Sequence, residues 1–502
     1  MSPQNNSGGI ESLEPTAVWR FFAGISSVPR PSKHEEKIRQ HIKDVAAENR
    51  FEVRQDQAGN LLIEVPASPG CAAAPITVLQ GHVDMVCEKN ADTEHDFERD
   101  PIELIIEHDP REKQQIVRAN GTTLGADNGI GMALALAAAS SPDVVHGPLE
   151  LLFTADEEAG MTGAKALSPD FFRGRRLFNL DSEEDDAIYI GCAGGSDSTL
   201  VWNTGARPPA ADVEVCRVSV KGLCGGHSGG DIHRNRGNAN KLLARTLLAS
   251  RSDTLQLAAF RGGSLRNAIP REAVAVVTGP TGTSDALAKA AARVQTEAAA
   301  ESAEDDPVIS VEKVTRGEAP AVIPAADTQR VLAALAALPH GVLGMHAKMA
   351  GLVETSNNVA TVSTELDEAD NTMKLTVGTL ARSSSTTQIH VTLRQIEAVG
   401  KLAGAEVTAA NPYPGWAPNV DSPALGTCRM VYERLFGERP KVTAIHAGLE
   451  CGIIGDRVGG MDAVSFGPKI TGAHSPDERV YVASVQKMWK YLCAVLTELA
   501  KG

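Results

Sequence analysis

Between Glu14 and about Gly191, short apolar runs of strand length alternate with amphipathic helical stretches, and this alternation limits the fold more than any other feature. Residues 76–79, 149–153 and 177–180 are the strand-length runs, and residues 129–139 form an alanine-rich helical stretch. Strands that alternate with helices in this way indicate an α/β layer on a mostly parallel sheet. We therefore predict an α/β domain for this part of the chain.

The pattern changes near residue 195 and returns near residue 413. Residues 203–211 read NTGARPPAA, a composition typical of a linker or an exposed turn. Alanine-rich segments of high helix propensity follow at 284–303 and 325–338, and no repeat with a period of 20–50 residues is visible. A chain of 502 residues suits two domains. We predict a disordered tail at 1–14, a discontinuous domain at 15–194 and 413–502, and an inserted domain at 195–412.

Composition excludes several classes of function. The chain has 48 Lys and Arg against 63 Asp and Glu, whereas nucleic-acid binders carry a basic surface. No segment approaches the roughly 18 apolar residues of a membrane span, and the N-terminus lacks the regions of a signal peptide. Eight cysteines without a C-x-x-C pair indicate neither a disulfide framework nor a thiolate zinc site. We expect a cytoplasmic protein that binds neither nucleic acid nor membrane.

Five motifs with acidic or histidine side chains lie at the ends of predicted strands or just before a helix. They carry His82 and Asp84 in GHVDMV, Asp127 in LGADNGIG, Glu157 and Glu158 in TADEEAGM, Asp181 in NLDSEE, and His474 in TGAHSPDE. Ligands of open α/β sheets bind outside the carboxyl ends of the strands. The five motifs are therefore expected to meet in one crevice.

The residue types in these motifs suit divalent metal ions. Carboxylates and imidazoles without a thiolate favour zinc, manganese or cobalt, and a pair of ions needs a bridging carboxylate such as Asp127. Of the neighbouring Glu157 and Glu158, one can bind metal while the other stays free as a base. Asp84 lies two residues from His82 and can hold its second ring nitrogen.

Longer segments resemble one enzyme family. The segments GHVDMV, LGADNGIG, TADEEAGM, NLDSEE, KGLCGGHSGG, GGSLRNAIPREA, HAGLECG and TGAHSPDE are similar to motifs of the aminoacyl-histidine dipeptidases. These are PepD-type, carnosinase-like members of the aminoacylase-type co-catalytic zinc peptidases, and the similarity runs from about Trp19 to the C-terminus. It implies an α/β, mostly parallel-sheet catalytic domain with an inserted α+β lid domain, and a homodimer formed through that lid.

The resemblance also implies a role for each residue of the metal centre. His82 and Asp181 would bind one zinc ion, Glu158 and His474 the other, and Asp127 would bridge the two. Glu157 would be the general base, and Asp84 the acid that orients His82.

In the remaining motifs the resemblance implies substrate-binding residues. His227 would stabilise the oxyanion, and Glu450 would hold the free α-amino group of a peptide. Arg382 and Asn267 are candidates for the C-terminal carboxylate and the carbonyl region.

The expected function is therefore hydrolysis of dipeptides with a free amino end, Xaa-His and others, by a water that two metal ions activate. Zinc is the expected metal, with manganese or cobalt as alternatives. The competing interpretations are an N-acyl amino acid hydrolase, a tripeptidase, and an inactive metal-binding scaffold. Glu450 argues against the first, because an acylated substrate has no ammonium group, and the intact Glu157 argues against the last.

Overall fold

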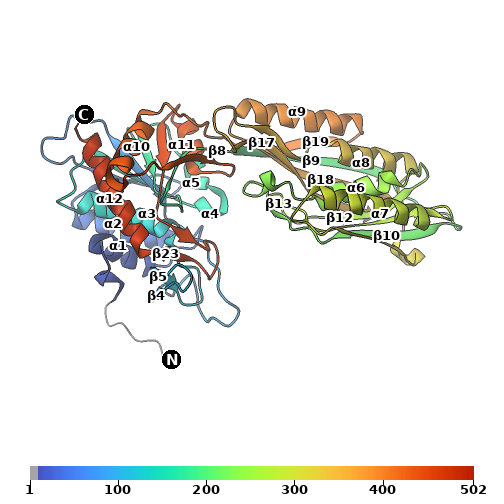
Figure 1. Ribbon diagram of the computed structural model, residues 1–502, viewed down its shortest axis with the longest axis horizontal. Helices are drawn as coiled ribbons and strands as arrows, with labels where there is room; N and C mark the ends of the chain where they lie inside the picture. The colour runs from blue at the N-terminus through green and yellow to red at the C-terminus, as the bar shows by residue number, and fades with distance from the viewer. Residues whose placement is uncertain (1–8, 502) are drawn as a thin grey trace. The chain divides into compact units, whose positions relative to one another are not determined.

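The computed structural model describes residues 9–501, which divide into two compact units (Figure 1). Unit 1 covers residues 9–191, Pro418–Ala444 and 449–501, and unit 2 covers Cys192–Ala417 and Ile445–Gly448. Residues 1–8 of the predicted tail lie outside the described residues, whereas Ile10–Ser12 form a 3-10 helix and Leu13 is buried. Within residues 9–501 no helix is long and apolar enough to cross a membrane.

Unit 1 is built on an eight-stranded sheet. Its strands, in sheet order, are β1 (Glu52–Gln55), β2 (Leu61–Val65), β6 (Leu149–Thr154), β3 (Thr77–His82), β7 (Arg176–Asn179), β21 (Asp462–Ser465), β8 (Ala187–Cys192) and β20 (Lys441–Ile445). The central strands β6, β3, β7 and β21 are parallel. The pairs β1–β2, β2–β6 and β8–β21 are antiparallel. The predicted parallel sheet is thus confirmed at the centre, with antiparallel strands toward both edges.

Helices and a smaller sheet complete unit 1. The helices are α1 (Thr16–Ser26), α2 (Glu36–Glu48), α3 (Ala126–Ser140), α4 (Glu157–Gly160), α5 (Thr162–Ala166), α10 (Pro423–Phe436), α11 (Glu450–Arg457) and α12 (Val482–Leu499). The smaller sheet has the strand order β22 (Ile470–Thr471), β23 (Arg479–Tyr481), β5 (Gln115–Ala119) and β4 (Leu104–His108). Helix α3 is buried along nearly its whole length because it is rich in Ala and Leu on every side.

The central strands of unit 1 position the predicted site. Every residue of β3 and β6 is buried, as expected for parallel strands covered on both faces. His82 is the last residue of β3, and Glu157 and Glu158 follow the end of β6. Asp181 follows β7 in the same way. These side chains therefore meet at the carboxyl edge of the parallel strands.

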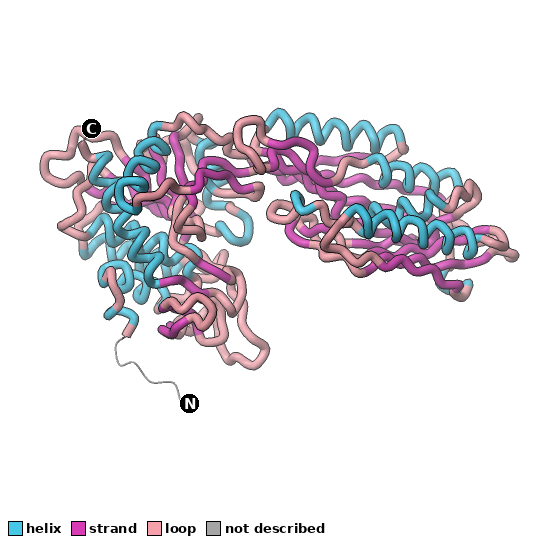
Figure 2. Tube along the Cα trace, in the orientation of Figure 1, coloured by secondary structure: helices cyan, strands magenta, loops and turns pink. Residues whose placement is uncertain are grey.

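Unit 2 is an antiparallel sheet with helices on one face (Figure 2). Its strands, in sheet order, are β15 (Val308–Lys313), β10 (Glu214–Lys221), β14 (Ala273–Gly279), β12 (Gln256–Gly262), β17 (Val353–Asp367), β18 (Thr372–Ser383), β9 (Gly194–Gly205) and β19 (Glu406–Tyr413), with β16 (Gly341–Met345) beside β17. A two-stranded ribbon joins β11 (Gly226–His227) to β13 (Ala268–Ile269). The helices are α6 (Ala239–Ala249), α7 (Thr283–Glu301), α8 (Ala325–Ala337) and α9 (Thr386–Leu402), with 3-10 turns at Ile232–Arg234 and Arg316–Glu318. Residues of all four α-helices share one apolar core with the sheet.

The strand order of unit 2 contains an internal structural repeat. The elements β10, α6, β12, β14, α7 and β15 form a βαββαβ module, and β9, α8, β17, β18, α9 and β19 form a second one. From each outer edge inward the sheet reads fourth, first, third and second strand of a module. The two second strands, β12 and β17, pair at the centre through Gly262 and Val362. The first module is inserted after the first strand of the second, so the second repeat is interrupted in sequence.

Candidate functional site

The five predicted metal ligands lie together in unit 1, with Asp127 between two histidines. Nε2 of the fully buried His82 lies 3.0 Å from Oδ1 of Asp127. The other oxygen of Asp127, Oδ2, lies 3.3 Å from Nε2 of His474. The two oxygens of one carboxylate therefore face two different imidazoles.

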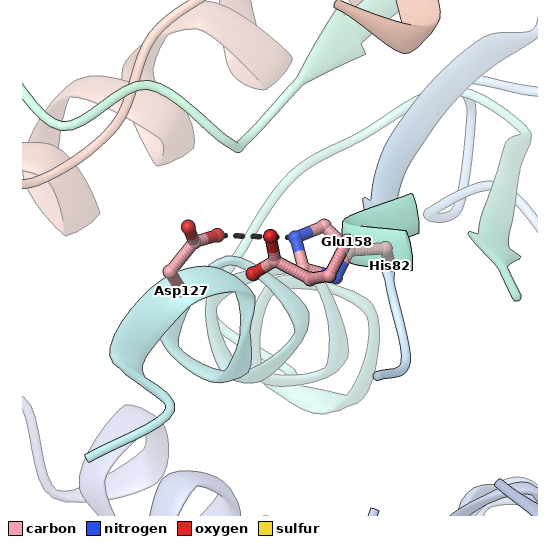
Figure 3. Close-up of side chains that lie close together, drawn as sticks. All are labelled: His82, Asp127 and Glu158. Carbon is pink, nitrogen blue, oxygen red and sulfur yellow. Dashed lines mark hydrogen bonds and ion pairs between the residues drawn. The ribbon is translucent and has the colours of Figure 1, made fainter. Parts of the chain in front are cut away.

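The two remaining ligands complete the set, one on each side of Asp127. Asp181 Oδ1 lies 3.3 Å from His82 Nε2, and Glu158 Oε2 lies 3.1 Å from His474 Nε2. Candidate ligand atoms of His82, Asp127 and Glu158 all lie within 4.8 Å of one another, and Figure 3 shows these side chains pointing toward a common point. Within residues 9–501, the buried Glu158 Oε1 has no hydrogen-bond partner, and Asp181 Oδ1 has its ion pair with His82 but no hydrogen bond.

The charges of this cluster fit a cation. Hydrogen bonds that His474 donates to the carboxylates of Asp127 and Glu158 raise its pKa to about 11. Burial alone would lower the pKa of His82, but the neighbouring Asp181 and Asp127 hold it well above its usual value. Burial raises the pKa of Asp181 to about 6. Three carboxylates thus surround two imidazoles, and the imidazoles hold protons at a place where a metal ion could balance the negative charge instead.

Asp84 binds the backbone of both glutamates and also contacts the imidazole of His82. Its Oδ1 accepts the backbone N–H of Glu157 at 3.0 Å, and its Oδ2 accepts that of Glu158 at 3.1 Å. The same Oδ1 lies 3.3 Å from His82 Nδ1, which also contacts the Asp84 backbone carbonyl at 3.2 Å. Although burial opposes ionisation, these contacts bring the pKa of Asp84 to about 2. Asp84 is therefore an anion that fixes the start of α4.

Glu157, the first residue of α4, carries a carboxyl group that favours the protonated form. Burial raises its pKa well above the usual value, and the nearby Asp181 and Glu450 add to this effect. A carboxyl group with a raised pKa holds a proton more readily than an ordinary glutamate, which suits a group that accepts and then donates a proton.

Glu450, the first residue of α11, is fully buried in unit 1. Its Oε2 accepts hydrogen bonds from Gln80 Nε2 and Thr154 Oγ1, both at 2.6 Å. Its Oε1 is buried without a hydrogen-bond partner in the described part of the chain. Burial raises its pKa to about 8, so a cation beside Oε1 would favour its ionised form.

His227 and Arg382, one from each βαββαβ module, meet within unit 2. His227 Nε2 lies 3.5 Å from Arg382 Nη2, and Arg382 Nη1 donates to Tyr413 Oη at 2.8 Å. Arg382 is 6% exposed, and no described carboxylate forms an ion pair with it. Asn267 lies near His227, because its backbone carbonyl accepts the N–H of Ser228, the next residue after His227, at 2.7 Å. A buried guanidinium group without an anionic partner suits a carboxylate ligand.

Comparison with known proteins supports the same chemistry. Residues 78–498 match the model of peptidase family M20/M25/M40. The chain belongs to this family. It is 42% identical over 493 residues to the cytosol non-specific dipeptidase of Escherichia coli K12, covering 98% of this chain and 99% of the relative. The crystal structure of the aminoacylhistidine dipeptidase from Vibrio alginolyticus matches with a TM-score of 0.88 and 43% identity, over 98% of both chains.

A more distant structure shows the same fold alone. A tripeptidase from Staphylococcus aureus has a TM-score of 0.60 at 14% identity and covers 98% of this chain and 100% of its own. The M20/M25/M40 match confirms the predicted family resemblance, the α/β fold class and the prediction that the protein is a metallopeptidase. Membership of this metallopeptidase family implies the use of divalent metal ions.

Two buried residues beside the metal ligands were not predicted from the sequence. Arg30 and Glu478 are each 2% exposed and bind the loops that carry His82 and Asp127. Glu478 ends the TGAHSPDE motif, so its place in that motif was the available signal. Arg30 lies in the segment VPRPS, which has no feature that distinguishes it from an ordinary turn.

Proposed function

We propose that this protein is a cytoplasmic, metal-dependent dipeptidase that hydrolyses dipeptides with a free amino end, Xaa-His dipeptides among them. The observation that carries the proposal is the position of Asp127, whose two oxygens face the imidazoles of His82 and His474. The names of the E. coli and Vibrio relatives support the dipeptide substrate.

In this proposal the cluster holds two divalent ions, with zinc as the expected metal and manganese or cobalt as alternatives. His82 and Asp181 would hold one ion, Glu158 and His474 would hold the other, and Asp127 would be shared between the two. Such ions fit the site because Glu158 and Asp181 each have a buried oxygen without a hydrogen bond. They also fit because every candidate ligand atom is a carboxylate oxygen or an imidazole nitrogen. Divalent ions there supply Lewis acidity, which polarises a peptide carbonyl and makes a water nucleophilic at neutral pH.

Glu157 is the proposed general base and acid. Its carboxylate removes a proton from the attacking water and then delivers it to the leaving amine. The raised pKa of Glu157 supports the second step, because a buried carboxyl group retains the proton until the amine accepts it. Asp84 keeps Glu157 beside the ligands by holding its backbone N–H.

The other predicted residues bind the substrate. Glu450 Oε1 would accept a hydrogen bond from the α-ammonium group of the peptide, which supports a preference for a free amino end. Arg382, whose buried guanidinium group lacks an anionic partner among the described residues, would bind the C-terminal carboxylate. His227 would donate to the oxyanion, and Asn267 would contact the carbonyl region.

The resemblance implies a homodimer through unit 2, which we retain as part of the proposal. His227 then acts either in its own chain or across the dimer. Mixing a Glu157→Ala chain with a His227→Ala chain, each inactive alone, separates the two arrangements. Recovered turnover in mixed dimers means that His227 acts across subunits, and no recovery in proven mixed dimers confines it to its own chain.

The test of the function is turnover on a panel of dipeptides, tripeptides and N-acetylated amino acids, with chelator and after metal is restored. We expect dipeptide cleavage that disappears with chelator and returns with zinc. Preferred cleavage of an acetylated amino acid would instead identify an N-acyl amino acid hydrolase, and preferred cleavage of tripeptides a tripeptidase. Metal binding without any turnover would identify a scaffold protein.

A further inference from the structure

Glu478 holds the loop that presents Asp127. Its Oε2 accepts the backbone N–H groups of Leu124 and Gly125 at 2.7 and 2.9 Å, and its Oε1 accepts the N–H of Asp127 itself at 3.2 Å. The carboxyl group is 2% exposed, so water does not compete for these three donors. Glu478 lies four residues beyond His474, and its own N–H donates to the carbonyl of Ser475. One side chain thus links the His474 loop to the Asp127 loop.

Arg30 holds the same loop from the opposite side. Its Nη2 donates to the carbonyl of Gly125, and its Nη1 donates to the carbonyls of Val83 and Asp84 at 3.0 and 2.6 Å. The guanidinium group therefore connects the Asp127 loop to the residues that directly follow His82. Gly125 has a φ of +66°, and a Cβ there would lie 2.6 Å from Arg30 Nη2, so the contact requires glycine.

The two side chains together fix the loop at Gly125. Glu478 binds its N–H and Arg30 binds its carbonyl, so the backbone of Gly125 is held from both ends. Through these contacts the loops of His82, Asp127 and His474 are tied to one another by buried, charged groups. Within residues 9–501, the side-chain hydrogen bonds of Arg30 and Glu478 all go to backbone groups and none to the side chain of a ligand.

We propose that Arg30 and Glu478 are positioning residues, which set the place of the Asp127 carboxylate between His82 and His474 and so determine the affinity of the second metal ion. This inference rests on the proposed function, because it assumes that Asp127 bridges two ions. The bridging carboxylate is the ligand most sensitive to a small displacement, since each of its oxygens must meet a different ion. The His474 side is expected to weaken first, because Glu478 connects that loop.

Glu478→Gln tests the inference without a change of shape. The amide oxygen can still accept from Leu124 and Gly125, but the amide NH₂ would then face the N–H of Asp127, and two donors cannot pair. Metal-free protein is titrated with Co²⁺, followed by its visible absorption, and with Zn²⁺ in competition with a chelator. We expect one ion to bind as in the wild type and the second to bind about 10- to 100-fold more weakly. Turnover should recover at high metal concentration.

Glu150→Gln is the matched control. Glu150 is 1% exposed and likewise accepts backbone N–H groups, those of Arg173 and Gly174, but it lies on no ligand loop. It should change thermal stability at most and leave both metal affinities unaltered. A role of Glu478 in folding alone would make the two variants behave alike. Wild-type affinity for both ions and a wild-type Co²⁺ spectrum in Glu478→Gln would overturn the proposal.

Two further variants keep every outcome informative. If Glu478→Gln does not fold, Arg30→Lys decides: its single ammonium group cannot reproduce the forked contacts, and wild-type binding of both ions would overturn the proposal. Asp127→Asn separates this failure from a failure of the proposed function. If Asp127→Asn still binds two ions with wild-type affinity, the dinuclear centre itself is refuted. If Asp127→Asn loses an ion while Glu478→Gln does not, only the positioning role of Glu478 is refuted.

Discussion

Asp84→Asn should damage catalysis more than the loss of a hydrogen bond to His82 would explain. The carboxylate receives the N–H groups of Glu157 and Glu158 on separate oxygens, and asparagine offers only one oxygen. One buried N–H is therefore left unpaired, which costs about 1–3 kcal/mol, and the remaining bond loses its charge assistance, roughly another 1 kcal/mol. His82 is less affected, because the backbone carbonyl of residue 84 also lies near its Nδ1.

The combined loss of about 2–4 kcal/mol corresponds to a decrease of about 30- to 1,000-fold in kcat/KM on a dipeptide. Steady-state kinetics with metal content measured for each preparation would show it, and kcat should carry most of the loss because Glu157 is displaced. Ser32→Ala is the control, since it removes only the hydroxyl that donates to Asp84 Oδ2 at 2.7 Å, and we expect less than about a tenfold effect. Activity of Asp84→Asn within threefold of the wild type, at full metal content, would refute the reasoning.

Three further predictions follow from buried groups. Glu157→Gln should retain the fold and bound metal while kcat falls by about 10²–10⁴-fold, the usual contribution of acid–base catalysis; an unchanged kcat would remove Glu157 from the mechanism. N-acetylation of a good dipeptide should lower kcat/KM by about 10- to 150-fold, and Glu450→Gln should narrow that gap; equal cleavage of both compounds would contradict the ammonium contact. In unit 2, burial lowers the pKa of His340 to about 4. Between about pH 6.5 and pH 4 the unfolded chain therefore binds a proton at this residue, whereas the folded chain does not. His340 therefore leaves the free energy of unfolding undiminished above pH 6.5 and lowers it as the pH falls toward 4, by about 2 kcal/mol at pH 5. His340→Gln should flatten this part of the pH dependence of the free energy of unfolding, measured with denaturant.

Much of the site can be predicted from the sequence because most of its residues lie at the ends of strands. His82, Asp181 and the Glu157–Glu158 pair each follow an apolar run, and parallel strands end at a common edge, so their convergence can be predicted without coordinates. The local pattern is sufficient here because chain direction and strand length determine where each side chain emerges. The same reasoning reaches Asp127 and His474 only through their motifs, since Asp127 lies at the irregular start of α3 and His474 in a loop, and neither follows a strand end directly.

The repeat of unit 2 shows where sequence patterns fail. Its two modules have the same strand order, but the first interrupts the second after β9, so no fixed period remains in the sequence. Strand pairing between distant segments, such as β9 with β18, depends on the folded core and not on local propensity.

The sequence by itself determined the residue types of the site, because apolar periodicity and motif chemistry are local properties of the chain. Only the tertiary structure decided which backbone groups these residues bind. The place of Asp84 at the start of α4, the free oxygen of Glu450 and the contacts of Arg30 and Glu478 with Gly125 are such cases. Each joins segments far apart in the chain, and such contacts are set by the requirement that buried polar groups find partners in the folded interior.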